Sequence, residues 1–287
     1  MVGEFRGLLL ASARAADPLG DIAGPACPYI LPIAGRPLIN HALRSLAAAG
    51  AGEILVVASP EIVADVEAAA GDPGVPVSFA TGAAALGAGE VLVHFGDSLL
   101  PSGFRAKSVP CAFVVDGGVV ACALDELPED LDAGSRPAIP TEHVELDGGW
   151  RYDGTVDGIL DANRLALDEL KRGRIGADLT SASVQGRVQI HPTAMLYGAK
   201  VRGPAYIGPE AIVSETYVGP YTSIGAGVRL EGVEIEHSIV MPRATIRYPG
   251  RRLEASLVGE GAQIGRDFSL PSALRLRVGK GADIQLG

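Results

Sequence analysis

The sequence predicts an α/β domain with a mostly parallel sheet, followed by a parallel β-helix domain. Two patterns support this fold class. Apolar runs of strand length alternate with amphipathic helical segments in the first part of the chain, and a near-hexad apolar repeat runs through residues 190–235. We therefore expect the α/β domain over residues 1–172, a linker over 173–184 and the β-helix over 185–287.

The α/β domain is predicted from short apolar runs that are followed by loops or amphipathic helices. A long loop rich in Pro, Gly and Asp is expected over residues 12–36. One helix should open at Pro37 and end at Gly50, and a second should start at Pro60 with Ser59 as its cap. This alternation is typical of a mostly parallel sheet with helices on its faces. The four predicted strands are Phe5–Ala11, Glu53–Ser59, Val75–Ala80 and Val91–Phe95.

The region after the fourth strand is less regular. Open parallel sheets bind ligands at the carboxyl ends of their strands. Asp97 follows a predicted strand and one glycine, so we expect Asp97 and the loop 12–36 to lie on the same edge of the sheet. Two strands, a loop and a helix are predicted in the remainder of the domain, at Cys111–Val115, Val119–Leu124, 125–142 and Val156–Arg172.

The predicted β-helix rests on apolar anchors whose spacing fits neither an α-helix nor a free-standing strand. Successive anchors are five or six residues apart and the series closes every 17 residues, as a three-sided coil requires. An ordinary all-β domain with regular turns is the alternative. We expect Ile207 and Ile224 to stack in one inward file. The anchors are Ile190, Leu196, Val201, Ile207, Val213, Val218, Ile224, Leu230 and Ile235.

The composition is that of a globular protein with an acidic net charge. The chain has 287 residues, 47% apolar and 20% charged, and its net charge of −10 argues against a nucleic-acid partner. Cys27, Cys111 and Cys122 are odd in number and widely spaced, which favours reduced thiols over disulfides or a zinc site. The apolar run Leu8–Ala11 behind Glu4 does not fit a signal peptide, and no stretch reaches the ~20 apolar residues of a membrane span. We therefore expect a cytoplasmic protein without membrane contact.

Residues 202–240 and several segments within residues 8–167 resemble sugar-1-phosphate nucleotidylyltransferases, most closely the long form of glucose-1-phosphate thymidylyltransferase. RGPAYIGPEAIVSETYVGPYTSIGAGVRLEGVEIEHSIV (202–240) is similar to the β-helix of that long form, which implies a left-handed hexapeptide-repeat coil. The resemblance also implies a truncated, nucleotidyltransferase-type (Rossmann-like) domain in front of the coil. The segments that carry it there are LLLAS (8–12), ILPIAGRPLINHAL (30–43), HFGDSLL (94–100) and Trp150 with DGILDANRLAL (157–167).

The resemblance breaks down where the family binds the triphosphate. The family's opening Gly-Gly-x-Gly-Thr-Arg falls on residues 12–17, where no glycine remains and Asp17 stands in place of the arginine. An aspartate repels a triphosphate, so this change is worse than the loss of a charge. The family's catalytic lysine falls on Pro28, and its second metal-binding aspartate falls on Tyr152.

Few residues that bind phosphate or metal remain. Asp97 is the candidate Mg²⁺ ligand, with Asp153 as the second; a solvated strand-end acid and a turn aspartate are the alternatives. Arg14 and Arg36 have the charge for a phosphate, although surface arginine is the alternative for each. The resemblance places nucleotide or phosphate binding at Ala11, Ser12, Ala13, Arg14 and Arg36. No residue is identified as catalytic.

Three functional hypotheses stay open. The first is a nucleotidylyltransferase-like pseudoenzyme with lost or strongly reduced transfer, which acts as a binding, scaffold or regulatory subunit. The second is an active Mg²⁺-dependent enzyme with a rebuilt site that makes an NDP-sugar, and the third is an enzyme of another class on the same fold. A nucleotide or sugar phosphate is the expected ligand. The tail 276–287 keeps an apolar pattern without a polar cap, which predicts a homo-oligomer or a partner subunit docked through the β-helix.

Overall fold

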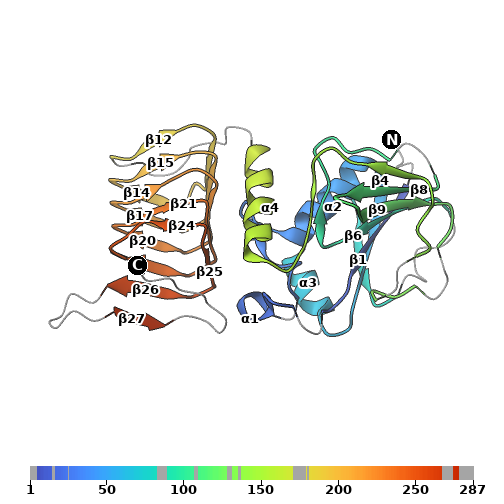
Figure 1. Cartoon of the computed structure of the whole chain (residues 1–287), viewed down its shortest axis with the longest axis horizontal. Helices are drawn as coiled ribbons and strands as arrows, with labels where there is room; N and C mark the ends of the chain where they lie inside the picture. The colour runs from blue at the N-terminus through green and yellow to red at the C-terminus, as the bar shows by residue number, and fades with distance from the viewer. Residues whose placement is uncertain are drawn as a thin grey trace. The chain divides into compact units, whose positions relative to one another are not determined.

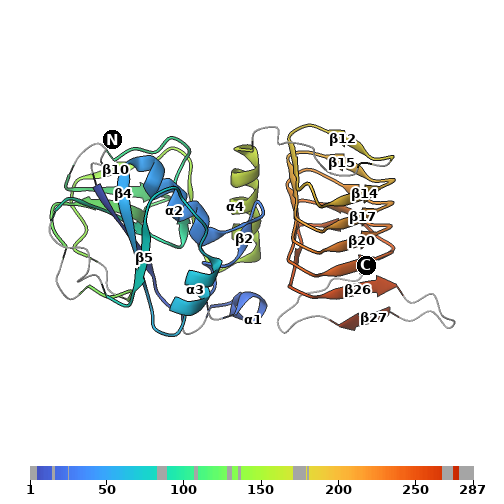
Figure 2. The same cartoon turned by 180° about the vertical axis from the view of Figure 1, so that it is seen from behind.

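The computed structural model describes residues 5–14, 17–24, 26–82, 89–106, 109–127, 131–134, 137–170, 179, 181–266 and 274–277. The chain divides into two compact units, which we describe separately. The first, here called the α/β unit, comprises Met1–Gly20, Gly24–Leu31 and Arg36–Gly154. The second, here called the coil unit, comprises Asp21–Ala23, Pro32–Gly35 and Thr155–Gly287. Figures 1 and 2 show the elements of both units from opposite sides.

A mixed, mostly parallel sheet forms the centre of the α/β unit. Within the described residues it has seven strands in the order β10-β8-β9-β6-β1-β4-β5, and only β9 runs antiparallel to its neighbours. The predicted mostly parallel sheet is therefore confirmed. The strands are β1 (Phe5–Ala11), β4 (Ala51–Ala58), β5 (Val77–Ala80), β6 (Val91–Phe95), β8 (Cys111–Val115), β9 (Gly118–Leu124) and β10 (His143–Glu145).

The order of the strands creates a switch point between β1 and β6. The chain proceeds from β1 through β4 to the edge strand β5, and then returns to the other side of β1 as β6. Open α/β sheets bind ligands outside the carboxyl ends of the strands at such a point. Strand β7 (Ser98–Leu99) follows shortly after β6 and pairs antiparallel with β11 (Trp150–Arg151), a strand from much later in the chain.

Both amphipathic helices of the α/β unit cover the same face of the sheet. Side chains of α2 (Leu38–Ala49) and α3 (Val63–Ala69) share one apolar cluster with alternate residues of β1 and β4. The opposite face packs against Leu127, Leu131 and Ala133, which lie outside any helix or strand. The expectation of helices on the faces of the sheet is therefore met on one face, while on the other face, within the described residues, the segment after β9 takes the place of a helix.

Several predicted boundaries differ from the structure. Helix α3 begins at Val63, not at Pro60, because the hydroxyl of Ser59 accepts a hydrogen bond from the backbone N–H of Ala13 (2.9 Å) and caps no helix. The predicted loop 12–36 contains three short elements, and the last helix ends at Asp168, not at Arg172. The three short elements are α1 (Gly20–Ala23), β2 (Pro32–Ile33) and β3 (Arg36–Pro37). The last helix is α4 (Val156–Asp168).

The coil unit consists of parallel strands that visit three sheets in rotation, which is the topology of a three-sided parallel β-helix. The stack is visible in Figure 1 as successive flat arrows from β12 to β26. The first sheet contains β12 (Ser183–Gln185), β15 (Lys200–Arg202), β18 (Tyr217–Val218), β21 (Glu234–Glu236) and β24 (Leu253–Glu254). The second contains β13 (Val188–Ile190), β16 (Ala205–Ile207), β19 (Thr222–Ile224), β22 (Ile239–Val240) and β25 (Leu257–Val258). The third contains β14 (Met195–Tyr197), β17 (Ile212–Ser214), β20 (Arg229–Glu231), β23 (Thr245–Arg247), β26 (Gln263–Arg266) and β27 (Leu274–Arg277).

The predicted inward files are confirmed. Ile190, Ile207 and Ile224 pair in register on neighbouring coils, and Ile207 and Ile224 are fully buried. The file continues to Val240, which pairs with Ile224 after an interval of 16 instead of 17 residues. At one corner, a side chain on Gly208 would approach the backbone of the next coil to 2.9 Å, so this turn requires glycine.

The predicted oligomer rests on an unpaired edge at the end of the coil unit. Strand β27 pairs antiparallel with β26, so backbone groups on that edge have partners from the same chain. The rest of the predicted tail lies outside the described residues. Helix α4 groups with the coils by its contacts, whereas the sequence-based division places it in the first domain; that division stays a prediction. Among the described helices, none is long and apolar enough to cross a membrane.

Candidate functional site

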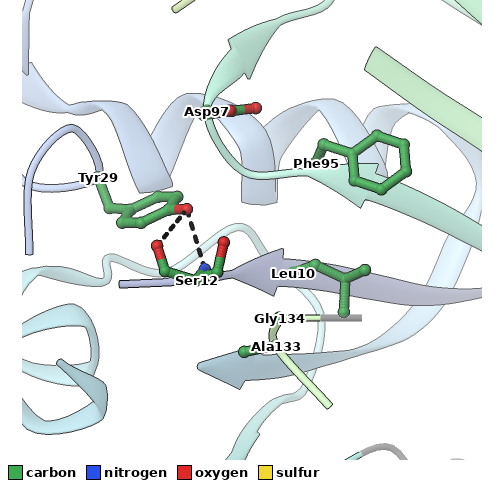
Figure 3. Close-up of a pocket in the computed structure, with 7 residues that line it drawn as sticks. All are labelled: Leu10, Ser12, Tyr29, Phe95, Asp97, Ala133 and Gly134. Atoms are coloured by element: carbon green, nitrogen blue, oxygen red, sulfur yellow. Dashed lines mark hydrogen bonds between the residues drawn. The ribbon is translucent and has the colours of Figure 1, made fainter. Parts of the chain in front are cut away.

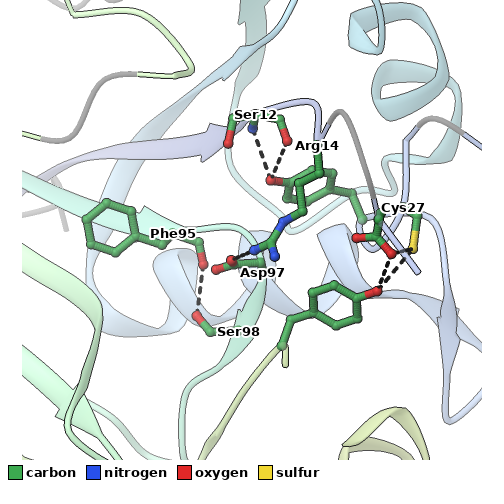
Figure 4. Close-up of polar contacts among 9 residues, drawn as sticks. Ser12, Arg14, Cys27, Phe95, Asp97 and Ser98 are labelled. Atoms are coloured by element: carbon green, nitrogen blue, oxygen red, sulfur yellow. Dashed lines mark hydrogen bonds and ion pairs between the residues drawn. The ribbon is translucent and has the colours of Figure 1, made fainter. Parts of the chain in front are cut away.

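The candidate site lies at the switch point of the α/β unit. Ser12 and Arg14 follow β1, Asp97 follows β6, and Tyr152 follows β11. The backbone N–H of Tyr152 donates to the carbonyl oxygen of Asp97 (2.9 Å), which fixes the end of β11 beside the end of β6. The structure thus brings Arg14 and Asp97 to one edge, as the sequence predicts (Figure 4).

An ion pair occupies the centre of the site. The guanidinium of Arg14 donates a hydrogen bond to the carboxylate of Asp97, toward which it points in Figure 4. The Asp97 side chain is 11% exposed and the Arg14 side chain 36% exposed, so the pair is only partly screened by solvent. The same guanidinium lies over the ring of Tyr152, 5.0 Å from its centroid. The charge of Arg14 is therefore already neutralised by a residue of the protein itself.

A second polar group surrounds Asp17. The hydroxyl of Tyr152 donates to Oδ1 of Asp17 (2.6 Å), and the thiol of Cys27 lies 3.5 Å from the same oxygen and 3.6 Å from the Tyr152 hydroxyl. Burial raises the pKa of Cys27 to about 12. Burial, together with the hydrogen bond to Asp17, raises the pKa of Tyr152. Both groups therefore stay protonated at neutral pH and serve as neutral donors to the carboxylate.

The loop after β1 is held by a tyrosine and not by glycines. The hydroxyl of Tyr29 accepts from the backbone N–H of Ser12 (3.0 Å) and donates to its carbonyl oxygen (3.1 Å), as Figure 3 shows. Burial, with the nearby charge of Asp97, raises the pKa of Tyr29 to about 12. The backbone groups of Ser12 thus already have partners within the chain. In a phosphate-binding loop such groups would bind the ligand.

Among the described residues, the pocket found at this edge is small. A pocket of about 40 Å³ lies between the ends of β1 and β6. Pockets for nucleotides and similar ligands measure roughly 300–1,000 Å³. The residues that line the pocket between β1 and β6 are Leu10, Ser12, Tyr29, Phe95, Asp97, Ala133 and Gly134 (Figure 3). Ala133 is 6% exposed and belongs to the same apolar cluster as Leu10 and Phe95, so the segment after β9 fills part of the edge.

The remaining predicted site residues are not among those that line this pocket. Ala11 is a buried residue at the end of β1, and the backbone N–H of Ala13 bonds to the Ser59 hydroxyl. Arg36 and Asp153 are exposed and do not line the pocket.

The described residues do not fit a magnesium site in this conformation. They contain no group of three or more His, Cys, Asp or Glu side chains arranged to hold a metal. The carboxylate of Asp97 is paired with Arg14, and Tyr152 offers a protonated phenol where a second carboxylate would be needed.

Sequence reasoning missed the roles of Cys27, Tyr29 and the segment 131–134. Their partners are distant in sequence, and no local pattern marks them. The replacement of the family's aspartate by Tyr152 was the one signal that could have suggested a hydrogen-bond donor at this position in place of a metal ligand.

Known proteins match about half of the chain. A glucose-1-phosphate thymidylyltransferase from Streptomyces antibioticus is 31% identical over 145 residues, which cover 50% of this chain and 40% of the relative. A low-salt glycan biosynthesis nucleotidyltransferase from Haloferax volcanii is 35% identical over 147 residues, or 50% of this chain and 41% of the relative. A glucose-1-phosphate thymidylyltransferase from Streptomyces griseus is 34% identical over 141 residues, or 49% and 39%.

No family profile matches the chain. The matched residues span about two fifths of the length of each of these relatives. By this match, half of the chain is similar to glucose-1-phosphate thymidylyltransferases and to a glycan biosynthesis nucleotidyltransferase.

Proposed function

We propose that this protein is a nucleotidylyltransferase-like homologue with lost or strongly reduced transfer, which acts as a binding, scaffold or regulatory subunit. The observation that carries the proposal is the ion pair between Arg14 and Asp97. Transfer of a nucleotidyl group requires positive charge on the phosphoryl oxygens and a carboxylate free to hold Mg²⁺. Here the cation at the strand ends and the candidate metal ligand neutralise each other.

The charges around the ion pair support the same conclusion. Arg14 contributes one positive charge, whereas Asp97 and Asp17 contribute two negative ones, so this group is unfavourable for a triphosphate. Asp17 is held in place by Tyr152 and Cys27, 135 and 10 residues away in sequence. A triphosphate would therefore have to break two sets of internal hydrogen bonds as well as overcome the repulsion.

The finer features of the protein are proposals that rest on the resemblance. We propose a left-handed coil, because residues 202–240 resemble the coil of the long form. The three free cysteines support a cytoplasmic location. We also propose self-association or docking of a partner through the coil unit, which size-exclusion chromatography with light scattering would test. A monomer at micromolar concentration would contradict this part.

Binding of ligands tests the proposed loss of the nucleotide site. Isothermal titration calorimetry with each nucleoside triphosphate, with and without Mg²⁺, should detect no binding tighter than about 1 mM. The thymidylyltransferase from Streptomyces antibioticus serves as the control under the same conditions. Micromolar, Mg²⁺-dependent binding of a triphosphate would favour the rebuilt active site. Binding of a sugar phosphate alone would support a binding subunit.

A further inference from the structure

A fully buried asparagine in the coil unit joins three separate segments. Asn163 lies on α4, and its Oδ1 accepts hydrogen bonds from the backbone N–H of Ala34 (2.9 Å) and the hydroxyl of Ser223 (2.7 Å). Its Nδ2 donates to the carbonyl oxygen of Tyr221 (3.1 Å). Both lone pairs of the amide oxygen and one N–H are thus used. Buried polar groups left without such partners destabilise a fold, so each bond fixes its segment.

The turn that Asn163 holds is closely fitted to the coils. Ala34 and Gly35 both have positive φ angles, 48° and 78°. A Cβ atom on Gly35 would lie only 2.1 Å from the ring of Tyr206 on β16, so the glycine backbone packs directly on that ring. Ala34 is 6% exposed. The turn Pro32–Gly35 is therefore an integral part of the coil unit, although it interrupts the sequence of the α/β unit.

The loop Gly24–Leu31 connects two segments that both belong to the coil unit. Asp21–Ala23 precede it and Pro32–Gly35 follow it. This loop carries Cys27 and Tyr29, two of the side chains that hold the candidate site together. Backbone N–H groups of α2 also hold the second end of the loop, since Leu38 donates to the carbonyl oxygen of Leu31 and Ile39 to that of Tyr29. Release of the turn therefore increases the conformational freedom of the loop without freeing this end completely.

We propose that Asn163 is a positioning residue through which α4 and the coils fix the turn Pro32–Gly35, and thereby the conformation of the loop that carries Cys27. The coil unit then controls the order of the candidate site through the covalent chain. This inference does not depend on whether the site has lost transfer. An active enzyme would use the same device to order its substrate loop.

Thiol alkylation tests the proposal, because Cys27 reports on its loop while Cys111 and Cys122 report on β8 and β9. All three cysteines are buried, so each reacts only after an opening of its surroundings. In Asn163→Ala, we expect the alkylation rate of Cys27, measured by peptide mass mapping, to rise at least ten-fold. The rates of Cys111 and Cys122 should change less than two-fold, and amide exchange should accelerate at Ala34.

Asn40→Ala is the matched control. The amide of Asn40 likewise makes two backbone hydrogen bonds, to Ala69 and Gly71, but these lie within the α/β unit and do not involve the turn. This variant should leave the rate of Cys27 within two-fold of wild type. If Asn163→Ala fails to fold, Ser223→Ala removes a single bond to Oδ1 and should still raise the Cys27 rate about three-fold.

Two results would overturn the inference. One is a folded Asn163→Ala protein whose Cys27 rate equals that of wild type. The other is an equal acceleration of all three cysteines, because this would indicate a general loss of stability instead of a local release. In either case the fate of the proposed function is decided separately, by the ligand titration.

Discussion

The coil unit and the strand-end edge of the α/β unit differ in how a sequence specifies them. In the coils one apolar role recurs, so Ile190, Ile207 and Ile224 stack in register and support one another. At the strand ends each polar side chain has one particular partner far away in sequence, as Arg14 has in Asp97. The comparison indicates that substitutions in the coils act on burial, whereas those at the edge act on charge and hydrogen bonding.

The largest effect is expected from a charge placed in an inward file of the coils. Ile224 is fully buried between Ile207 and Val240. Ile224→Asp should lower the free energy of unfolding by roughly 3–5 kcal/mol or more, because it buries an unpaired carboxylate. Ile224→Val is the control and should lower it by about 0.5–1.5 kcal/mol. Urea titration followed by circular dichroism measures both changes in unfolding free energy. Equal effects of the two variants would contradict the conclusion that burial determines the effect of substitutions in the coils.

The core of the α/β unit contains a buried histidine, whereas the inward files of the coils are apolar. His94 on β6 is fully buried, and neither ring nitrogen has a hydrogen-bond partner among the described residues. Burial lowers the pKa of His94 to about 4. The unfolded chain then binds a proton below about pH 6.5, which the folded chain accepts only near pH 4. Stability should therefore fall by roughly 3 kcal/mol as the pH drops through this window.

His94→Leu isolates this contribution from the other titrating groups. Between pH 7 and pH 4, the unfolding free energy of the His94→Leu protein should fall by less than that of wild type. The difference should equal the roughly 3 kcal/mol expected from the titration of His94. Urea titrations at several pH values in this range provide the measurement. Equal pH dependence of the two proteins would show that the imidazole finds a partner or is hydrated in solution.

A smaller effect is expected when one hydrogen bond is removed at the site. Tyr152→Phe deprives Asp17 of the donor at 2.6 Å and should lower the unfolding free energy by about 2 kcal/mol. Tyr248→Phe is the matched control in the coil unit, where the hydroxyl bonds to Glu231 (3.0 Å) in contact with solvent. The control should show no measurable change. A neutral Tyr152→Phe would indicate that water replaces the phenol.

The smallest effect should follow from breaking the ion pair itself. Arg14→Met should lower the unfolding free energy by about 1 kcal/mol, since the Arg14 side chain is 36% exposed and its charge is partly screened. Arg187→Met breaks the more exposed pair with Asp168 in the coil unit and should have a still smaller effect. The same thermal and urea melts measure both. A loss above 3 kcal/mol for Arg14→Met would identify the pair as structural.

Local patterns were sufficient to predict the coils and part of the edge. The 17-residue period predicted the inward residues through Ile235. It did not predict Val240 and Leu253, because these residues pair with the preceding coil after intervals of 16 and 18 residues. The rule for parallel strands placed Arg14 and Asp97 together.

The rest of the site depends on contacts that no sequence period encodes. Tyr152 reaches Asp17 across 135 residues, and Tyr29 holds Ser12 from 17 residues away. The segment with Leu131 and Ala133 covers a face of the sheet although it has no helical period. The turn between β2 and β3 likewise depends on a tertiary contact, the hydrogen bond from the backbone N–H of Ala34 to Asn163.

The release of pyrophosphate is a direct measure of whether this protein has lost nucleotidylyl transfer. The protein is incubated with Mg²⁺, each common nucleoside triphosphate and a panel of sugar-1-phosphates, beside the thymidylyltransferase from Streptomyces antibioticus as a positive control. Removal of one electrostatic group at such a site typically lowers the rate by about 10²–10³. By the resemblance, two such groups are absent here, because Asp17 and Pro28 stand where the family has an arginine and a lysine. We predict no release above the blank without enzyme. Turnover near 1 s⁻¹, which is within the usual range of enzymes, would contradict the proposed loss of transfer.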